Sequence, residues 1–355
     1  MLGAVALAAA LTGAAAPRVS VQRRVASMGT TAEVEIVART REEGLAASEA
    51  VVEELRRVED LLTTWRESPL RRLNEAPANR DVEVGGELAA ALREVLAWSE
   101  RTGRAFDPTV APLVRAWDLR GAGRIASSDE IAAALAAVGP ANFRADASAG
   151  TAARLHPSAG IDEGAWGKGY GLDAAARRLA ASGVADARID LGGQELALGT
   201  SESGAPWDID VAHPRDRNRA VLTLALSGLS VSTSGNSERG RTVSGVRIGH
   251  ELDPRTGRPA PDFGSVTVLA ASGLVADALS TAFFVLGPDR GLELSEELRR
   301  QGVPQEVLFL VGGDTGRLRA AVSPSFSKHV ARVDEGAVGG VSAGAASSLS
   351  RRESR

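Results

Sequence analysis

The chain has 355 residues and contains no cysteine. Disulfides, thiolate nucleophiles, iron–sulfur clusters and cysteine zinc sites are therefore excluded. The sequence has only four histidines, His156, His213, His250 and His329, and no two of them have the spacing of a helical zinc motif. A metal bound by this chain is therefore expected to be a hard cation held by oxygen atoms.

The sequence also lacks a strong excess of charge. It contains 41 basic and 45 acidic residues, mixed along the chain, for a formal net charge of −4. Nucleic-acid binding usually requires a clustered basic face, which this pattern does not supply. Small molecules or other proteins are the expected partners, and nucleic acid is not.

The two ends differ from the rest in composition. Residues 1–18 form an apolar, alanine-rich run that ends in small residues, as secretory signals do, although it has no positive start. We expect a leader segment here and export to the periplasm or cell envelope, with a cytoplasmic location as the alternative. The run is too short for a stable membrane span. Residues 331–355 are rich in Gly, Ala and Ser and predict a disordered tail.

Between these ends, residues 19–330 show neither a linker-like break nor a fixed repeat, so a single catalytic domain is expected. Strands and helices alternate irregularly, with several hairpin-like strand pairs, which predicts an α+β fold with mixed sheets and packed helices. The patterns predict strands over 31–38, 265–272, 307–311 and 318–322, short β runs between 187 and 235, and helices over 42–65, 87–102, 129–138, 274–286 and 291–300, the third capped by Ser127 or Ser128.

The segment GIDEGAWGKGYGLD (160–173) is rich in glycine and leads into a helix that we expect to end at Gly183. Its glycines let the backbone approach a ligand, the helix start offers free N–H groups, and Lys168 adds a cation, which together suit a pyrophosphate. It matches neither the P-loop nor the GxGxxG pattern. A glycine-rich turn before a packed helix is the alternative.

The segment GLVADALSTAFFVLG (273–287) carries an aspartate inside an apolar helix. Asp277 and Thr281 are four residues apart and share a helix face, with Ser280 beside them. A buried carboxylate needs a partner, and Mg²⁺ takes carboxylate and hydroxyl oxygens as ligands. The alternatives are that Asp277 caps the helix or pairs with a basic residue.

Two further segments contain candidate polar groups. In GHELDPRTGRP (249–259), His250 precedes a tight turn and could act as a general base, or it could only stabilise the turn. In AFDPTVAPLV (105–114), Asp107 precedes a proline, where it could equally form a local turn.

Eight short motifs follow one another along the chain: Met28-Gly29-Thr30, Thr64-Trp65…Ser68…Leu73-Asn74, Ala105-Phe106-Asp107, 162–173, Gly192-Gly193-Gln194, 232–235, 250–259 and 276–287. In this order they resemble the ApbE family, the FAD:protein FMN transferases. The resemblance spans roughly residues 25–290 and implies a mixed-sheet, T-fold-related catalytic domain. Gln194 departs from the asparagine that the family commonly has.

The resemblance implies roles for particular residues. The metal ligands would be Asp277, Thr281 and the backbone carbonyl of Ala165, with Ser280 as a further contact. His250 and Asp277 would be catalytic. Lys168 matches a position where the family has Lys or Glu. The positions implied to contact FAD are Met28, Trp65, Ala105, Phe106, Asp107, Asp162, Lys168 and Leu252.

The activity implied by the resemblance is Mg²⁺-dependent transfer of FMN from FAD to a Thr or Ser hydroxyl of a partner flavoprotein, with release of AMP. Two alternatives stay open. One is a FAD pyrophosphatase that uses water in place of the acceptor. The other is a periplasmic FAD-binding protein without turnover, although storage would not need a metal at the pyrophosphate.

Overall fold

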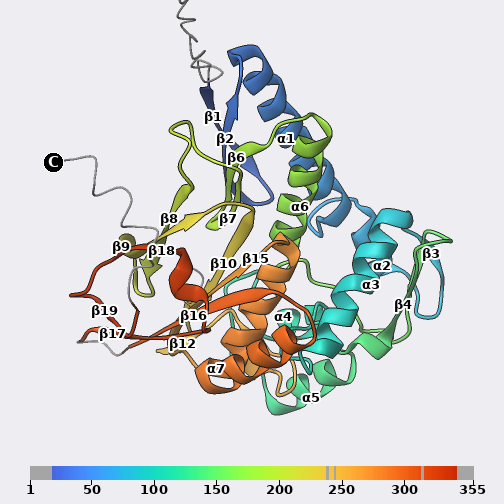
Figure 1. Cartoon of the computed structure of the whole chain (residues 1–355). Coiled ribbons are helices and arrows are strands. Elements are labelled where there is room, and N and C mark those ends of the chain that lie inside the picture. The colour runs from blue at the N-terminus through green and yellow to red at the C-terminus, as the bar shows by residue number, and fades with distance from the viewer. Residues whose placement is uncertain (1–17, 237–239, 244, 313–315, 342–355) are drawn as a thin grey trace, which may run out of the picture.

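The computed structural model describes residues 18–236, 240–243, 245–312 and 316–341. Its main element is a nine-stranded sheet (Figure 1). Neighbouring strands are antiparallel throughout, except for the last pair, which is parallel. The strands in spatial order are β1 (Val19–Ser27), β2 (Thr30–Ala38), β6 (Asp186–Leu191), β7 (Gln194–Leu198), β10 (Leu229–Gly235), β15 (Gly264–Ala270), β16 (Gln305–Val311), β17 (Leu318–Val322) and β19 (Val338–Gly339).

One face of this sheet is covered by three helices, α1 (Arg41–Leu62), α6 (Gly167–Ala181) and α7 (Gly273–Arg300) (Figure 1). The other face of its C-terminal half packs on a smaller sheet of β8 (Trp207–His213), β9 (Asp216–Leu226) and β18 (Val330–Val333). The fold is therefore α+β with mixed sheets, as the sequence predicts.

Strand β16 shows how the layers are held together. Val307 and Phe309 pack in the cluster that contains α7, whereas Leu308 and Leu310 pack in the cluster that contains β8 and β9. Successive side chains of a strand point to opposite faces, so a continuous apolar run is what a strand buried on both faces requires. Each of these four side chains is fully buried.

The remaining elements are short or lie beside the main layers. Helix α3 packs against a small three-stranded sheet, and two hairpins precede β15. These elements are α2 (Pro69–Glu75), α3 (Gly86–Arg101), α4 (Ala111–Ala116), α5 (Ser128–Ala136), the sheet β3 (Val82–Glu83), β5 (Thr151–Arg154) and β4 (Phe143–Asp146), the hairpins β11 (Arg241–Val243) with β12 (Val246–Ile248) and β13 (Leu252–Asp253) with β14 (Arg258–Pro259), and the 3-10 turns Pro140–Asn142 and Phe326–His329.

Local signals in the sequence agree with several helix ends. Ser127 caps α5, and its side chain and that of Glu130 form the reciprocal pair of a capping box. The two helices predicted over 274–286 and 291–300 form α7. This helix is interrupted at Gly287 (φ 74°), and Pro288 follows directly after the interruption. A positive φ and a proline together explain the break.

Two sequence predictions need correction, and several short elements were missed. The first helix ends at Leu62 and not at residue 65, because Thr63 leaves the helical conformation. The N–H of Thr63 donates the last hydrogen bond of the helix, to the carbonyl of Glu59. Strand β1 was not predicted. Residues 331–341 are folded and not part of a disordered tail, because β18 and β19 complete two sheets and Val338 is buried. Residues 1–17 of the predicted leader and 342–355 of the predicted tail lie outside the described residues.

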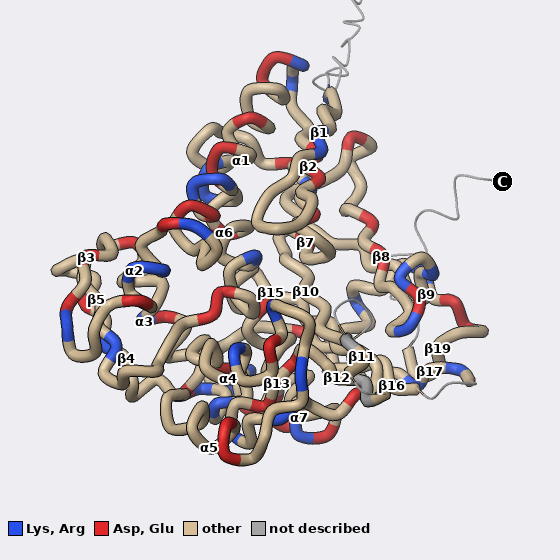
Figure 2. Tube along the Cα trace, turned by 180° about the vertical axis from the view of Figure 1, so that it is seen from behind, with Lys and Arg blue, Asp and Glu red and all other residues tan. Residues whose placement is uncertain are grey.

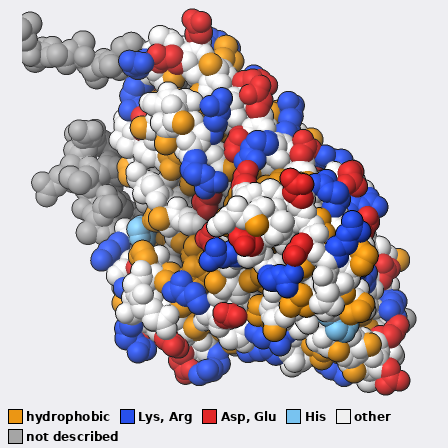
Figure 3. All heavy atoms as spheres, turned by 90° about the vertical axis from the view of Figure 1, so that its right-hand side faces the viewer, with side chains coloured by type: hydrophobic (Ala, Val, Ile, Leu, Met, Phe, Trp, Pro, Cys, Tyr) orange, Lys and Arg blue, Asp and Glu red, His pale blue; other side chains and the backbone are white. Residues whose placement is uncertain are grey.

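Acidic and basic residues are mixed along the chain (Figure 2). Lys and Arg are interspersed with Asp and Glu over the face seen in Figure 3. Among the described residues, no helix is both long and apolar enough to cross a membrane.

Candidate active site

Asp277 supplies a buried carboxylate to the candidate site. It lies inside α7 with 5% of its surface exposed. Its Oδ2 accepts a hydrogen bond from the backbone N–H of Gly169 at 3.1 Å, and its Oδ1 lies 3.5 Å from the hydroxyl of Ser232. Burial raises the pKa of the Asp277 carboxyl, and the nearby ammonium of Lys168 opposes the rise. A buried carboxylate with so few donors is suited to bind a cation.

Asp277 is not the helix cap. Ser272 caps α7, since its hydroxyl accepts from the N–H of Val275. Asp173, at the end of the glycine-rich segment, caps the same helix end from α6. Its carboxylate accepts from the N–H groups of Gly273 at 2.5 Å and Leu274 at 3.1 Å, and from the hydroxyl of Ser272 at 2.6 Å. This role of Asp173 was not predicted, because it depends on a helix 100 residues later.

Helices α6 and α7 cross at very short distance, and Figure 1 shows the start of α7 beside α6. A Cβ on Gly169 would lie 2.2 Å from the carbonyl oxygen of Gly273, so only glycine allows this crossing. Gly167, Gly169 and Gly171 lie within α6 and not in a loop, so the loop predicted from these glycines is shorter than expected. Gly169 therefore allows the close packing of α6 on α7, and this packing places the N–H of Gly169 beside Asp277.

Hydroxyl groups line the other side of Asp277. Ser280 is fully buried, and its hydroxyl lies 3.1 Å from that of Ser232 and 3.0 Å from that of Ser234, both on β10. It also donates to the backbone carbonyl of Asp277. Thr281 follows one turn after Asp277 and is 9% exposed. The oxygens of Asp277 and Ser280 therefore lie close to the hydroxyl of Ser232, and Thr281 follows on the same helix.

No group of three or more His, Asp or Glu side chains suited to a metal occurs among the described residues. A cation here would be held by one carboxylate together with neutral oxygens. That donor set still fits Mg²⁺, which usually takes one or two carboxylates and completes its shell with water and phosphate oxygens.

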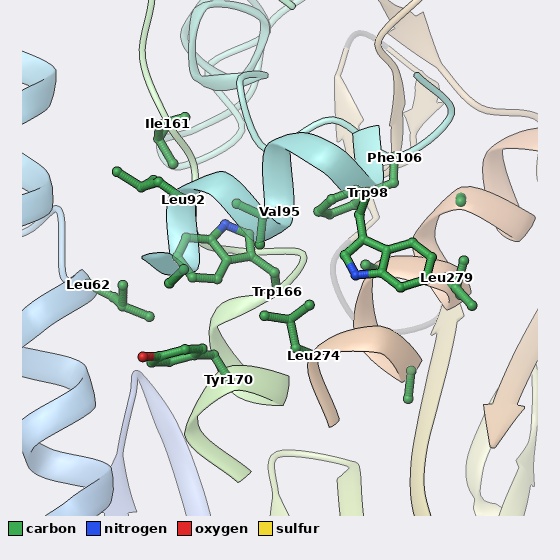
Figure 4. Packing of buried hydrophobic residues seen from close by; sticks show 14 of the residues in the cluster. Leu62, Leu92, Val95, Trp98, Phe106, Ile161, Trp166, Tyr170, Leu274 and Leu279 are labelled. Carbon is green, nitrogen blue, oxygen red and sulfur yellow. The ribbon is translucent and has the colours of Figure 1, made fainter. Parts of the chain in front are cut away.

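The loop before α6 is fixed at several points. Asn74 holds the backbone of Ile161 by two hydrogen bonds of 2.9 and 2.8 Å, and the indole N–H of Trp166 donates to the carbonyl of Asp162 at 2.9 Å. Trp166 is fully buried between α3 and α6, beside Tyr170 (Figure 4). The loop that carries Ala165 is therefore rigidly attached to the core.

Several positions implied to contact FAD have buried side chains. Ala105 and Phe106 are fully buried, backbone included, and the N–H of Phe106 donates to the hydroxyl of Thr102. Asp107 makes the local turn that was the alternative reading, because its Oδ1 accepts from the N–H and hydroxyl of Thr109. Leu252 packs in an apolar cluster with α4 and α5.

Met28 and Trp65 lie near the end of α1. The N–H of Met28 donates to Glu59 at 2.8 Å, and the residue takes a positive φ of 51°. Trp65 is 69% exposed. A side chain this open is available to a ligand.

His250 is a quarter exposed, and its Nε2 lies 3.3 Å from Oε1 of Glu251. Its Nδ1 is buried and has no hydrogen-bond partner in the part of the chain that the structure describes. The following turn is closed by other groups, since the N–H of Gly257 donates to Asp253 and the indole of Trp117 donates to Gly257. These turn contacts do not involve the imidazole.

Glu251 was not singled out in the sequence. Its charge acts on Asp277 and further raises the pKa of that carboxyl, after the larger effect of burial. Glu251 therefore lies within electrostatic range of Asp277, although the two are 26 positions apart in the sequence.

Comparison with known proteins matches the sequence and the fold of this chain to one family. A model described as "ApbE family" matches residues 28–304. A FAD:protein FMN transferase of Haemophilus influenzae is 30% identical over 287 residues, covering 76% of this chain and 82% of that protein. One from Treponema pallidum is 33% identical over 270 residues, covering 71% and 74%. The solved flavin transferase ApbE of Vibrio cholerae has a TM-score of 0.76 and 28% identity, covering 88% of this chain and 100% of that one. The chain therefore belongs to the ApbE family.

Proposed function

We propose that this chain is a Mg²⁺-dependent FAD:protein FMN transferase. The observation that carries the proposal is the buried carboxylate of Asp277 at the crossing of α6 and α7, surrounded by neutral oxygens. The relatives named FAD:protein FMN transferase support the reaction type.

The metal would be held by Asp277, Ser280, Thr281 and the backbone carbonyl of Ala165. When bound there, Mg²⁺ would neutralise the charge that develops on phosphate oxygens as the pyrophosphate breaks. Lys168, in the first turn of α6 and close enough to act on Asp277, adds a positive charge on the same side. The start of α6 adds the positive end of the helix dipole.

In the proposed reaction, the oxygen of an acceptor Thr or Ser attacks the phosphorus of the FMN half of FAD. A new P–O bond joins FMN to the acceptor, the pyrophosphate P–O bond breaks, and AMP leaves with the electron pair. His250 would take the hydroxyl proton through one of its ring nitrogens. Asp277, before it engages the metal fully, is the other candidate for this proton.

Trp65 and Lys168 would contact FAD through their side chains, and so would Met28 and Leu252 where they are accessible. The carboxylate of Asp162 is engaged by Arg120 and by the N–H of Gly164, so Asp162 would act on FAD mainly by shaping the loop. Ala105 and Phe106 are fully buried, so a contact with FAD would require a local movement of this segment. Asp107 would shape the loop, because its carboxylate is already engaged by Thr109 and Arg104.

The acceptor would be a flavoprotein domain with an exposed Thr or Ser. We further propose that the protein is exported to the periplasm or cell envelope and meets its acceptor there. The support for export is the composition of residues 1–18.

AMP release from FAD tests the proposal directly. The purified protein is incubated with FAD, with and without Mg²⁺, and with and without an acceptor flavoprotein domain, and covalent flavin is followed by in-gel fluorescence. Transfer predicts AMP and fluorescent acceptor only when Mg²⁺ and acceptor are both present. AMP and FMN without acceptor would support a pyrophosphatase instead, and no AMP in any condition would leave FAD binding alone.

A further inference from the structure

Trp65 differs from the other tryptophans of this protein. Trp98, Trp117, Trp166 and Trp207 are at most 6% exposed, whereas Trp65 is 69% exposed. A single exposed aromatic side chain is common on protein surfaces and does not indicate a site by itself. Its neighbours give the second observation.

The guanidinium of Arg120 lies over the Trp65 ring, with 5.1 Å between its central carbon and the ring centroid. Arg120 belongs to the loop between α4 and α5, far from Trp65 in the sequence. This distance is within the range of a cation–π interaction. The same guanidinium donates to the hydroxyl of Thr64 at 2.5 Å, so it contacts two successive residues after α1.

Arg120 is also fixed from its other side. Its Nη2 lies 2.7 Å from Oδ2 of Asp162 and 3.0 Å from both carboxylate oxygens of Glu163. The side chains of Asp162 and Glu163 are only 13% and 18% exposed. Hydrogen bonds between charged groups that are partly shielded from water are among the stronger ones. Displacing Arg120 would leave two largely buried carboxylates without their cation.

One arginine therefore joins the end of α1 to the loop before α6. That loop carries Ala165 and leads to Gly169, whose N–H binds Asp277. Because Arg120 is held in place while most of the Trp65 surface stays open, the arginine can support the ring without covering it.

We propose that Arg120 is a positioning residue that supports the Trp65 ring as a fixed stacking surface for one of the two flat ring systems of FAD. It also fixes the distance between this surface and the loop that carries Ala165. The inference rests on the proposed function. A ring that an arginine already holds in place loses less conformational entropy when a ligand stacks on it, which favours binding.

The test measures FAD affinity by flavin fluorescence for wild type, Arg120→Ala, Trp65→Ala and the double variant, with Mg²⁺ and without acceptor. We expect Arg120→Ala to weaken FAD binding about tenfold, within the range that stacking contacts provide. If Arg120 acts through Trp65, the double variant binds FAD about as weakly as Trp65→Ala alone. In a separate assay with an acceptor domain, Arg120→Ala should lower turnover at saturating FAD by a smaller factor than it lowers FAD affinity, because stacking acts on binding.

Arg124→Ala is the matched control, since Arg124 lies in the same loop and pairs with Glu130 at 2.7 Å. It should bind FAD as wild type does. Arg120→Lys keeps the charge but not the planar fork, so it should restore part of the affinity and covers the case in which the alanine variant fails to fold.

Two outcomes would overturn the inference. Tighter FAD binding by Arg120→Ala would mean that the arginine occupies the face that FAD needs. Effects of Arg120→Ala and Trp65→Ala that simply multiply would mean that the two residues act separately. A wild-type protein that binds FAD but transfers no FMN would contradict only the proposed function, because the affinity comparison still stands.

Discussion

The backbone N–H of Gly169 donates to Oδ2 of Asp277 across the crossing of α6 and α7, with 3.1 Å between nitrogen and oxygen. This bond ties the glycine-rich segment to the carboxylate that we propose as the metal ligand. Replacing the carboxylate separates its chemical role from its structural one. We expect Asp277→Ala to fold and to lose FMN transfer, because most of the Mg²⁺ affinity depends on this charge. Wild-type turnover at limiting Mg²⁺ would refute the metal assignment.

The same carboxylate should destabilise the metal-free protein. Burial raises the pKa of Asp277, so between the unfolded and the folded pKa the folded protein binds a proton that the unfolded chain has released. Stability from this group is therefore present at low pH and falls as the pH rises from the unfolded value of Asp through the raised folded one.

We expect Asp277→Asn, measured by thermal unfolding with EDTA at neutral pH, to melt a few degrees above wild type, since one kcal/mol moves the midpoint by about that much. Mg²⁺ should raise the melting temperature of wild type and leave the variant unchanged. A metal-free variant that melts below wild type would contradict this prediction.

The helix crossing itself can be tested at Gly169. A methyl group there would meet the carbonyl oxygen of Gly273 at 2.2 Å, a contact that requires the two helices to move apart. We expect Gly169→Ala to lower the free energy of unfolding by about 1–3 kcal/mol, as overpacking does, and to abolish transfer. Gly316→Ala, where nothing lies within 4 Å of the added methyl, is the control and should be neutral in denaturant unfolding. Equal stability of the two variants would show that the crossing tolerates a wider spacing.

Patterns of near neighbours predicted the fold class and most elements of this protein. The apolar run of β16 predicts a buried strand, and the pair Ser127 and Glu130 predicts the start of α5, each from residues within a few positions of one another. The strand β1 could not be found in this way. It lies at the edge of the sheet and is held by its pairing with β2, which the local sequence of β1 does not reveal.

The candidate site shows the same limit. The sequence indicated Asp277 and the glycine-rich segment separately, and the order of its motifs linked them only through a family resemblance. The contacts of Asp173 with Gly273, of Arg120 with Asp162, and of Ser280 with Ser232 join residues that are more than 40 positions apart. Such contacts follow from the packing of whole helices and strands, which no local pattern specifies.

Export is a separate prediction. The apolar run before Pro17 ends in three alanines, which suit the small-residue cleavage site of a secretory signal. We expect the mature protein in native cells to begin after about residue 16 and to fractionate outside the cytoplasm. N-terminal sequencing of protein from fractionated cells measures both. An intact Met1 in the cytoplasmic fraction would contradict export and favour the cytoplasmic alternative.

His250 gives the sharpest test of mechanism. Its Nδ1 is buried without a partner among the described residues, its Nε2 lies 3.3 Å from Glu251, and the neighbouring turn is closed by other groups. If His250 is the general base, His250→Ala should lower turnover by roughly 10²- to 10⁴-fold and leave FAD affinity within about twofold. Flavin fluorescence measures the affinity, and transfer to an acceptor domain measures the turnover.

His156→Ala, at an exposed turn between β5 and α6, is the control for loss of a histidine and should match wild type in both measurements. Loss of affinity and of thermal stability in parallel with activity would assign His250 to shaping the site. A phosphoryl transfer with a loose transition state asks little of a general base. If turnover falls by less than about tenfold, the general base would therefore be Asp277 or a group of the acceptor, and not His250.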